Sequence, residues 1–128
     1  MILDSSAILA ILFAEPGHER LLERINAASA VAVGGPTVLE AAIVLGARTR
    51  KDPRPVLHEF LRDAEAEIVP FGPDHYHAAV DAFLRFGKGR HPAGLNFGDC
   101  MSYAVASLAG LPLLFAGDDF AATDIDVA

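Results

Sequence analysis

The chain has 128 residues, of which 52% are hydrophobic, and this length supports one compact domain with its own core rather than two. Its formal net charge of −7 argues against indiscriminate binding of nucleic acid through a generally basic surface, but it leaves room for a local basic patch. The longest apolar run, residues 7–14, is far shorter than the roughly 20 residues that cross a bilayer, so we expect no membrane anchor.

Short apolar strands alternate with helices along the chain. In chain order, the sequence predicts a strand at 1–3, a helix with apolar positions from 8 to 13, a helix from 18, a strand at 31–33, a helix from 36 or 37, a helix at 55–64, a strand at 68–71, a helix at 73–86, a loop at 87–94, a helix from 96 to 108 and a strand at 113–115. Because each strand is short and continuously apolar, this pattern favours the α/β class, with a short parallel sheet flanked by helices on both faces.

Four carboxylates occupy positions where such a fold gathers functional groups. Asp4 follows the first strand and Asp118 follows the last, while Glu40 and Asp99 lie in or near the first turn of a helix. In open α/β sheets, ligands collect beyond the carboxyl ends of the strands, which is also the edge where the following helices begin. Buried carboxylates that repel one another need a cation to keep them charged. We therefore expect these four acids to converge on a hard divalent metal.

The expected metal is Mg²⁺ or Mn²⁺, because such ions take carboxylate oxygens and keep water ligands that phosphate oxygens can replace. A water on the metal becomes a nucleophile, which predicts phosphodiester hydrolysis. Asp4, Asp99 and Asp118 are the predicted metal ligands. Glu40 is predicted to be a further ligand or the group that orients the attacking water.

Taken singly, each acid also fits a structural role. Asp99 could complement a helix dipole, and Asp118 with Asp119 could form an ordinary turn. Four acids at comparable places in the fold reverse that preference in favour of a site. Ser6 and Asn96 are the side chains predicted to support the ligands.

Five segments carry a resemblance to a known family. They are residues 1–7, which contain Asp4; 37–41, which contain Glu40; 85–100, which contain Asp99; 113–120, which contain Asp118 and Asp119; and 123–125. In order and spacing they resemble a PIN-domain ribonuclease, and specifically a VapC-type toxin of a bacterial toxin–antitoxin pair. The resemblance covers residues 1–128 as one PIN-like nuclease domain.

This resemblance implies a Mg²⁺- or Mn²⁺-dependent endoribonuclease that cuts cellular RNA, often structured RNA such as tRNA or rRNA. It also implies inhibition by a cognate antitoxin protein and a homodimer. The family places its fourth acid less rigidly than the others, so Asp118 and the adjacent Asp119 both remain candidates, and Asp118 is favoured.

A basic segment precedes Asp99 and contains Arg85, Lys88, Arg90 and His91. In an acidic protein, such a loop beside a metal site could hold RNA phosphates, and it could equally be a solvated surface loop. A second basic cluster that starts at Arg48 is interpreted as the exposed end of a helix.

Helices over 37–45 and 96–108 are rich in small and apolar residues, which could support a symmetric dimer or belong to the core. By the family resemblance, the first two helices could form a groove for an amphipathic antitoxin segment. Cys100 is the single cysteine, which excludes an internal disulfide and suits a reducing compartment. Because strand-like residues begin at Met1, no secretory leader is expected, and the predicted location is the cytoplasm.

Two other functions remain open. One is a catalytically silent PIN-like domain that binds without cutting. The other is an aspartate-based phosphatase, which expects a second acid two residues after Asp4, where this chain has Ser6.

Overall fold

A four-stranded parallel sheet lies at the centre of the computed structural model, which describes residues 1–128. The elements are β1 (Ile2–Leu3), α1 (Ser5–Leu12), α2 (His18–Ala27), β2 (Val31–Gly34), α3 (Gly35–Thr49), α4 (Arg54–Asp63), β3 (Ala66–Val69), α5 (Pro73–Phe86), α6 (Phe97–Ala109) and β4 (Leu113–Leu114). The strand order is β3-β2-β1-β4, and every pairing is parallel. All four carboxyl ends therefore meet at one edge, and the predicted α/β class is confirmed.

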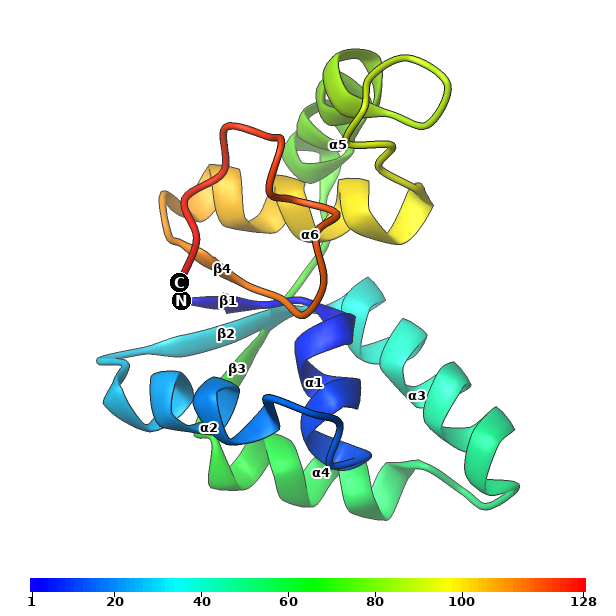
Figure 1. Ribbon diagram of the computed structural model, residues 1–128, viewed down its shortest axis with the longest axis vertical. Coiled ribbons are helices and arrows are strands. Elements are labelled where there is room, and N and C mark those ends of the chain that lie inside the picture. The colour runs from blue at the N-terminus through cyan, green and yellow to red at the C-terminus, as the bar shows by residue number, and fades with distance from the viewer.

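Helices cover both faces of the sheet, with α1 to α4 on one face and α5 and α6 on the other (Figure 1). Each face of the sheet has its own hydrophobic core, and neighbouring residues of one strand contribute to different cores. Ile2 packs in the core under α5 and α6, and Leu3 packs in the core under α1 to α4. Leu113 and Leu114 divide in the same way. This alternation follows from the two-residue period of a strand, and each fully buried aliphatic side chain contributes about 1.5–3 kcal/mol.

Two predicted boundaries differ from the structure. The third strand is Ala66–Val69 rather than 68–71, since Pro70 has no amide hydrogen to extend the ladder. The third helix begins at Gly35 rather than at residue 36 or 37, with Pro36 inside its first turn. Glu40 consequently lies at the start of the second turn of α3, close to the predicted first turn.

The chain after β4 has no regular secondary structure, yet it follows a defined course. It turns back past the start of α1, runs beside α6 and returns to the sheet, so that the two termini lie close together (Figure 1). Val127 forms a parallel bridge with Leu113, and Phe120 is fully buried against the α5 and α6 side of the core. None of the ten elements is a helix with the length and apolar character that crossing a membrane requires.

Candidate metal-dependent active site

Asp4 sits between β1 and α1 and caps the helix. Its Oδ2 accepts hydrogen bonds from the backbone N–H of Ser6 at 3.0 Å and from the Ser6 hydroxyl at 2.5 Å. Its Oδ1 is buried and has no hydrogen-bond partner. An orphaned buried acceptor costs about 1–3 kcal/mol, so Asp4 presents an oxygen that a cation would satisfy.

Asp99 lies in the first turn of α6 and forms a reciprocal cap with Asn96. The backbone N–H of Asp99 donates to Asn96 Oδ1 at 2.9 Å, and the backbone N–H of Asn96 donates to Asp99 Oδ2 at 2.9 Å. Burial raises the pKa of Asp99 to about 6, against the opposing effect of the Asn96 hydrogen bond. Repulsion from three neighbouring acids raises this pKa further, and these acids are Asp4, Asp119 and Glu40.

Glu40 approaches the same place from α3. Its Oε1 accepts a hydrogen bond from the hydroxyl of Ser5, the first residue of α1. Its Oε2 lies against Gly98, where a Cβ would collide with the carboxylate. The absence of a side chain at Gly98 thus lets Glu40 reach the first turn of α6, beside Asp99.

Of the two candidate acids after β4, the structure favours Asp119 over Asp118 as the fourth member of the cluster. Asp119 lines the pocket that contains the other three acids, whereas Asp118 does not. Gly117, with φ of +89°, turns the chain, and Phe120 then inserts into the core at 1% exposure. These two constraints turn Asp119 toward the pocket and leave Asp118 in solvent, where its backbone carbonyl accepts from the N–H of Ala121.

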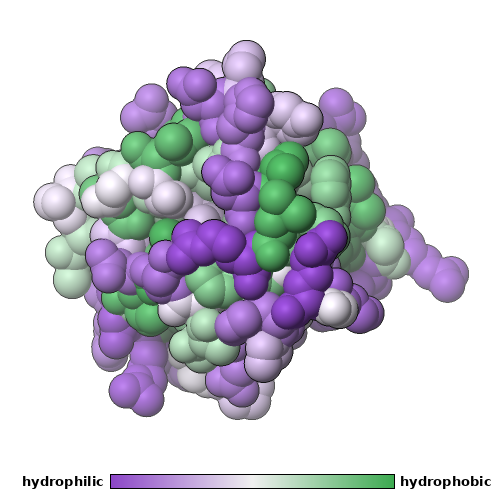
Figure 2. All heavy atoms as spheres, turned by 90° about the horizontal axis from the view of Figure 1, so that it is seen from above, coloured by the Kyte–Doolittle hydropathy of each residue, from purple (hydrophilic) through white to green (hydrophobic).

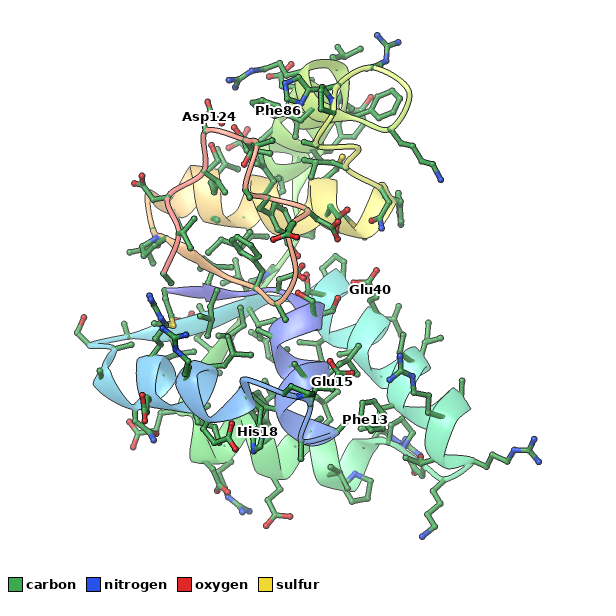
Figure 3. All side chains as sticks on the ribbon, viewed as in Figure 1. Phe13, Glu15, His18, Glu40, Phe86 and Asp124 are labelled. Carbon is green, nitrogen blue, oxygen red and sulfur yellow. The ribbon has the colours of Figure 1, made fainter.

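The acidic pocket has a volume of about 460 Å³ and continues along α1 and α3 to Glu15 and Arg48. Figure 3 shows Glu40 near the start of α1 and Glu15 beside the same helix, farther along. Arg48 lies 3.7 Å from the Glu15 carboxylate, and its guanidinium stacks 4.8 Å from the ring centroid of Phe13. Sequence reasoning placed Arg48 at an exposed helix end. The four-residue steps from Glu40 to Val44 and from Val44 to Arg48 were the available signal that all three residues share one face of α3.

The donor set suits a hard divalent cation. All four groups are carboxylates, one buried oxygen has no partner, and the pKa of Asp99 is raised by its burial and, to a smaller extent, by repulsion from the other three acids. As the side chains stand, no three His, Cys, Asp or Glu groups are close enough together to hold one ion. Mg²⁺ commonly uses only one or two carboxylates and completes its shell with water, so the residues still fit such an ion.

The predicted supporting residues occupy their expected places. Ser6 accepts from the backbone N–H of Ala116 at 3.1 Å while donating to Asp4, so it joins the ends of β1 and β4. Asn96 holds Asp99 as described. Ser5, which holds Glu40, was not singled out in the sequence because its partner is 35 residues away.

The basic segment divides into two kinds of residue. Arg85 binds Asp124 at 2.6 Å and stacks on Phe86, and His91 accepts from the backbone N–H of Ala93 and packs edge-on against the same ring. These contacts hold Arg85 and His91 within the fold, and a role for them in RNA binding stays a prediction. The other two residues of the basic segment, Lys88 and Arg90, are exposed.

Three comparisons identify relatives. The PIN domain family model matches residues 1–126. Ribonuclease VapC36 of Mycobacterium tuberculosis is 42% identical over 127 residues, covering 98% of this chain and 91% of that protein. Ribonuclease VapC of Mycolicibacterium smegmatis is 41% identical over 125 residues, covering 98% and 97%.

Solved structures share the fold at low sequence identity. VapC20 of Mycobacterium tuberculosis superposes with a TM-score of 0.78 at 15% identity, covering 99% of this chain and 97% of that one. A toxin–antitoxin complex from Klebsiella pneumoniae matches with a TM-score of 0.71 at 18% identity, covering 99% and 95%. The family model and the relatives above 40% identity establish that the chain belongs to the PIN domain family and, within it, to the VapC ribonucleases.

Proposed function

We propose that the protein is a Mg²⁺- or Mn²⁺-dependent endoribonuclease that acts as the toxin of a toxin–antitoxin pair, with residues 1–128 forming its nuclease domain. The observation that carries the proposal is the gathering of Asp4, Glu40, Asp99 and Asp119 in one pocket, although they come from four separate segments. Membership of the VapC ribonucleases supplies the reaction class.

In this proposal Asp4 and Asp99 are the principal metal ligands, and Asp119 contributes directly or through a water molecule. A bound Mg²⁺ or Mn²⁺ would neutralise charge at the scissile phosphate and make a water a better nucleophile. Asp4 offers its unpartnered Oδ1, and Ser6 keeps that carboxylate oriented through Oδ2. Asn96 fixes Asp99 through the reciprocal cap.

Glu40 is placed to position and deprotonate the attacking water. One of its oxygens is held by Ser5, and the other lies at the first turn of α6, beside Asp99. A carboxylate in that position can accept a proton from a water molecule held beside it. General base catalysis of this kind contributes roughly 10²–10⁴-fold to a rate.

RNA would be held by the few cations near the acids. Arg48 lines the far end of the acidic pocket, where it can reach a phosphate flanking the scissile one. Lys88 and Arg90 lie in the loop that leads to α6, and neither forms an ion pair in the structure. Because the chain carries a net charge of −7, binding must depend on such local positive charge.

A homodimer is proposed through the faces of α3 and α6. Leu39 and Ile43 on α3 are 59% and 61% exposed, and Phe97 at the start of α6 is 81% exposed. All three line one apolar groove of about 390 Å³. Exposed apolar residues gathered in this way mark an interaction surface, and a second copy of the same surface would cover them. The end of the molecule that carries α5 shows further apolar surface between charged side chains (Figure 2).

A cognate antitoxin is the second proposed protein partner, consistent with the toxin–antitoxin complex among the structural neighbours. The surface formed by α1 and α2 is its proposed docking place. Phe13 and Leu21 there are only partly buried. Cellular RNA as the substrate and a single cysteine, Cys100, support a cytoplasmic location.

The deciding experiment measures cleavage of a long structured RNA by the purified protein with Mg²⁺, with Mn²⁺ and with a chelator. Cleavage should require the ion, and Asp4→Asn should reduce it to background. The matched control is Asp63→Asn, which removes an exposed carboxylate at the end of α4 and should cleave normally. Binding of RNA without cleavage under all conditions would instead favour a catalytically silent PIN-like domain.

A further inference from the structure

The loop that carries Asp119 is tied down at both ends. At its start, the backbone N–H of Ala116 donates to the Ser6 hydroxyl, which in turn donates to Asp4. At its end, Asp124 accepts hydrogen bonds from two side chains, one on α5 and one on α6. Tyr103 donates its hydroxyl to Asp124 Oδ1 at 2.5 Å, and Arg85 binds Asp124 Oδ2 at 2.6 Å.

One of the two residues that bind Asp124, Tyr103, lies on the same helix as Asp99. Tyr103 lies one turn after Asp99 on α6 and is 5% exposed within the core cluster that also contains Phe120. The Arg85 guanidinium lies 4.6 Å from the ring centroid of Phe86 and 3.4 Å from the Tyr103 hydroxyl. Tyr103 is therefore fixed by its burial, and Arg85, which is half exposed, is oriented by its stack on Phe86. Figure 3 shows Asp124 beside Phe86, away from Glu40.

The protonation states of Asp124 and Tyr103 favour the hydrogen bond between them. Hydrogen bonds from Tyr103 and Arg85 lower the pKa of Asp124, which keeps it a carboxylate. Burial and the bond to Asp124 raise the pKa of Tyr103 to about 12, which keeps it a donor. The contact therefore persists across the pH range in which a protein of this kind works.

The chain between Asp119 and Asp124 has little freedom. Phe120 is buried, and its carbonyl accepts from both the backbone N–H and the hydroxyl of Thr123, at 3.0 and 2.8 Å. The Thr123 hydroxyl also accepts from the backbone N–H of Ile125 at 3.3 Å. A short hydrogen-bonded turn therefore connects Asp124 to Phe120 and to the adjacent Asp119.

We propose that Arg85 and Tyr103 are positioning residues that act through Asp124 to hold Asp119 in the acidic pocket beside Asp99. The inference rests on the proposed function, since it gives Asp119 a role in metal binding. It also explains why a basic residue that precedes the site, Arg85, is paired within the chain. Groups that orient metal ligands without touching the metal commonly change metal affinity by 10–100-fold.

The test is a double-mutant cycle on Mn²⁺ affinity, measured by calorimetry. Asp124→Ala should weaken Mn²⁺ binding about tenfold in the parent and in an Asp118→Asn background, which keeps the pocket intact. In an Asp119→Asn background the same change should have an effect of less than about twofold, because the ligand that it positions is already lost. Equal losses in all three backgrounds would overturn the proposal, and so would an unchanged affinity in the parent.

A second measurement covers the case in which Asp119→Asn binds Mn²⁺ too weakly for titration. Asp124→Ala and Tyr103→Phe should both speed amide hydrogen exchange at Ala121 and Thr123 in the metal-free protein, and each should lower kcat for RNA while KM stays unchanged. Unaltered exchange at these amides would overturn the proposal. A parent protein that binds no Mn²⁺ would instead remove the proposed function, which separates the two failures.

Discussion

The carboxylate of Glu40 and the backbone of Gly98 share one small space between α3 and α6. A Cβ at position 98 would overlap the carboxylate. Glu40 and Gly98 therefore determine how closely α3 approaches the first turn of α6. Glu40 reaches the first turn of α6 because residue 98 has no side chain.

This relationship predicts an unusual effect of Gly98→Ala. In an open helix the change would stabilise by up to about 1 kcal/mol, but here the methyl group must push the Glu40 carboxylate away from Ser5, so this gain should be lost and cleavage should fall. Urea unfolding of the variant and of Glu40→Ala/Gly98→Ala tests the cause, because removing the carboxylate should restore stability. Gly72→Ala is the control, since nothing lies within 4 Å of its Cβ position. A double variant no more stable than Gly98→Ala would contradict the collision.

The raised pKa of Asp99 predicts that the stability of the metal-free protein depends on pH. Its pKa in the fold is raised from 3.8 to about 6, so between these values the folded state binds a proton that the unfolded state has released. The metal-free protein should therefore lose about 1–3 kcal/mol as the pH rises from about 4 to 6 and should remain at the lower value above it. Asp99→Asn should remove this contribution, stabilise the metal-free protein at pH 7 and abolish cleavage, while retaining the cap on Asn96.

Urea unfolding of the parent and Asp99→Asn in chelator, at a series of pH values, measures the difference directly. Addition of Mg²⁺ at pH 7 should stabilise the parent and have a much smaller effect on the variant. A difference between the two proteins that does not change from pH 4 to 7 would contradict the assignment.

The two adjacent acids after β4 should behave differently. Asp119→Asn should weaken metal binding and cleavage, since this side chain lines the pocket, whereas Asp118→Asn should leave both unchanged. The pair is well matched, because both positions are exposed and the substitution is the same. Cleavage lost in Asp118→Asn and retained in Asp119→Asn would reverse the assignment of the fourth acid.

Lys88 and Arg90 should contribute to RNA affinity through phosphates. Replacing both by Ala should weaken RNA binding and lower the slope of log affinity against log salt by about 2. Filter binding at several salt concentrations measures this slope. The control variant Lys51→Ala/Arg62→Ala removes the same charge from exposed positions in or near α4. If its salt slope falls by the same amount, RNA binding depends on the net charge of the protein and not on Lys88 and Arg90.

The apolar face around Phe97 should hold the dimer together. Phe97→Asp should give a monomer in light scattering, while Val56→Asp, at a 49% exposed position on α4, should leave the mass unchanged. A parent protein that is already monomeric at micromolar concentration would contradict this interface.

Sequence patterns predicted those parts of the site that local structure determines. Asp4 follows a strand and caps the next helix, and Asp99 forms a reciprocal cap with a residue three positions away, so neighbouring residues fix both. The alternating cores of the sheet follow in the same way from the short apolar strands. These are interactions for which a few residues of context are sufficient.

The remaining parts depend on contacts between distant segments. The orientation of Asp119 follows from the burial of Phe120, and the pairing of Arg85 spans 39 residues to Asp124. Glu40 reaches the site only because Ser5 and Gly98 receive it. No local pattern distinguishes Asp118 from Asp119, or a cation that binds RNA from one that holds the fold.

A crystal structure of the protein soaked in Mn²⁺, with anomalous diffraction, tests most directly whether the four acids form a metal centre. The account predicts an anomalous peak in the acidic pocket, within coordination distance of Asp4 Oδ1 and of an Asp99 oxygen. A pocket that stays empty at saturating Mn²⁺, while RNA is still cleaved, would contradict it.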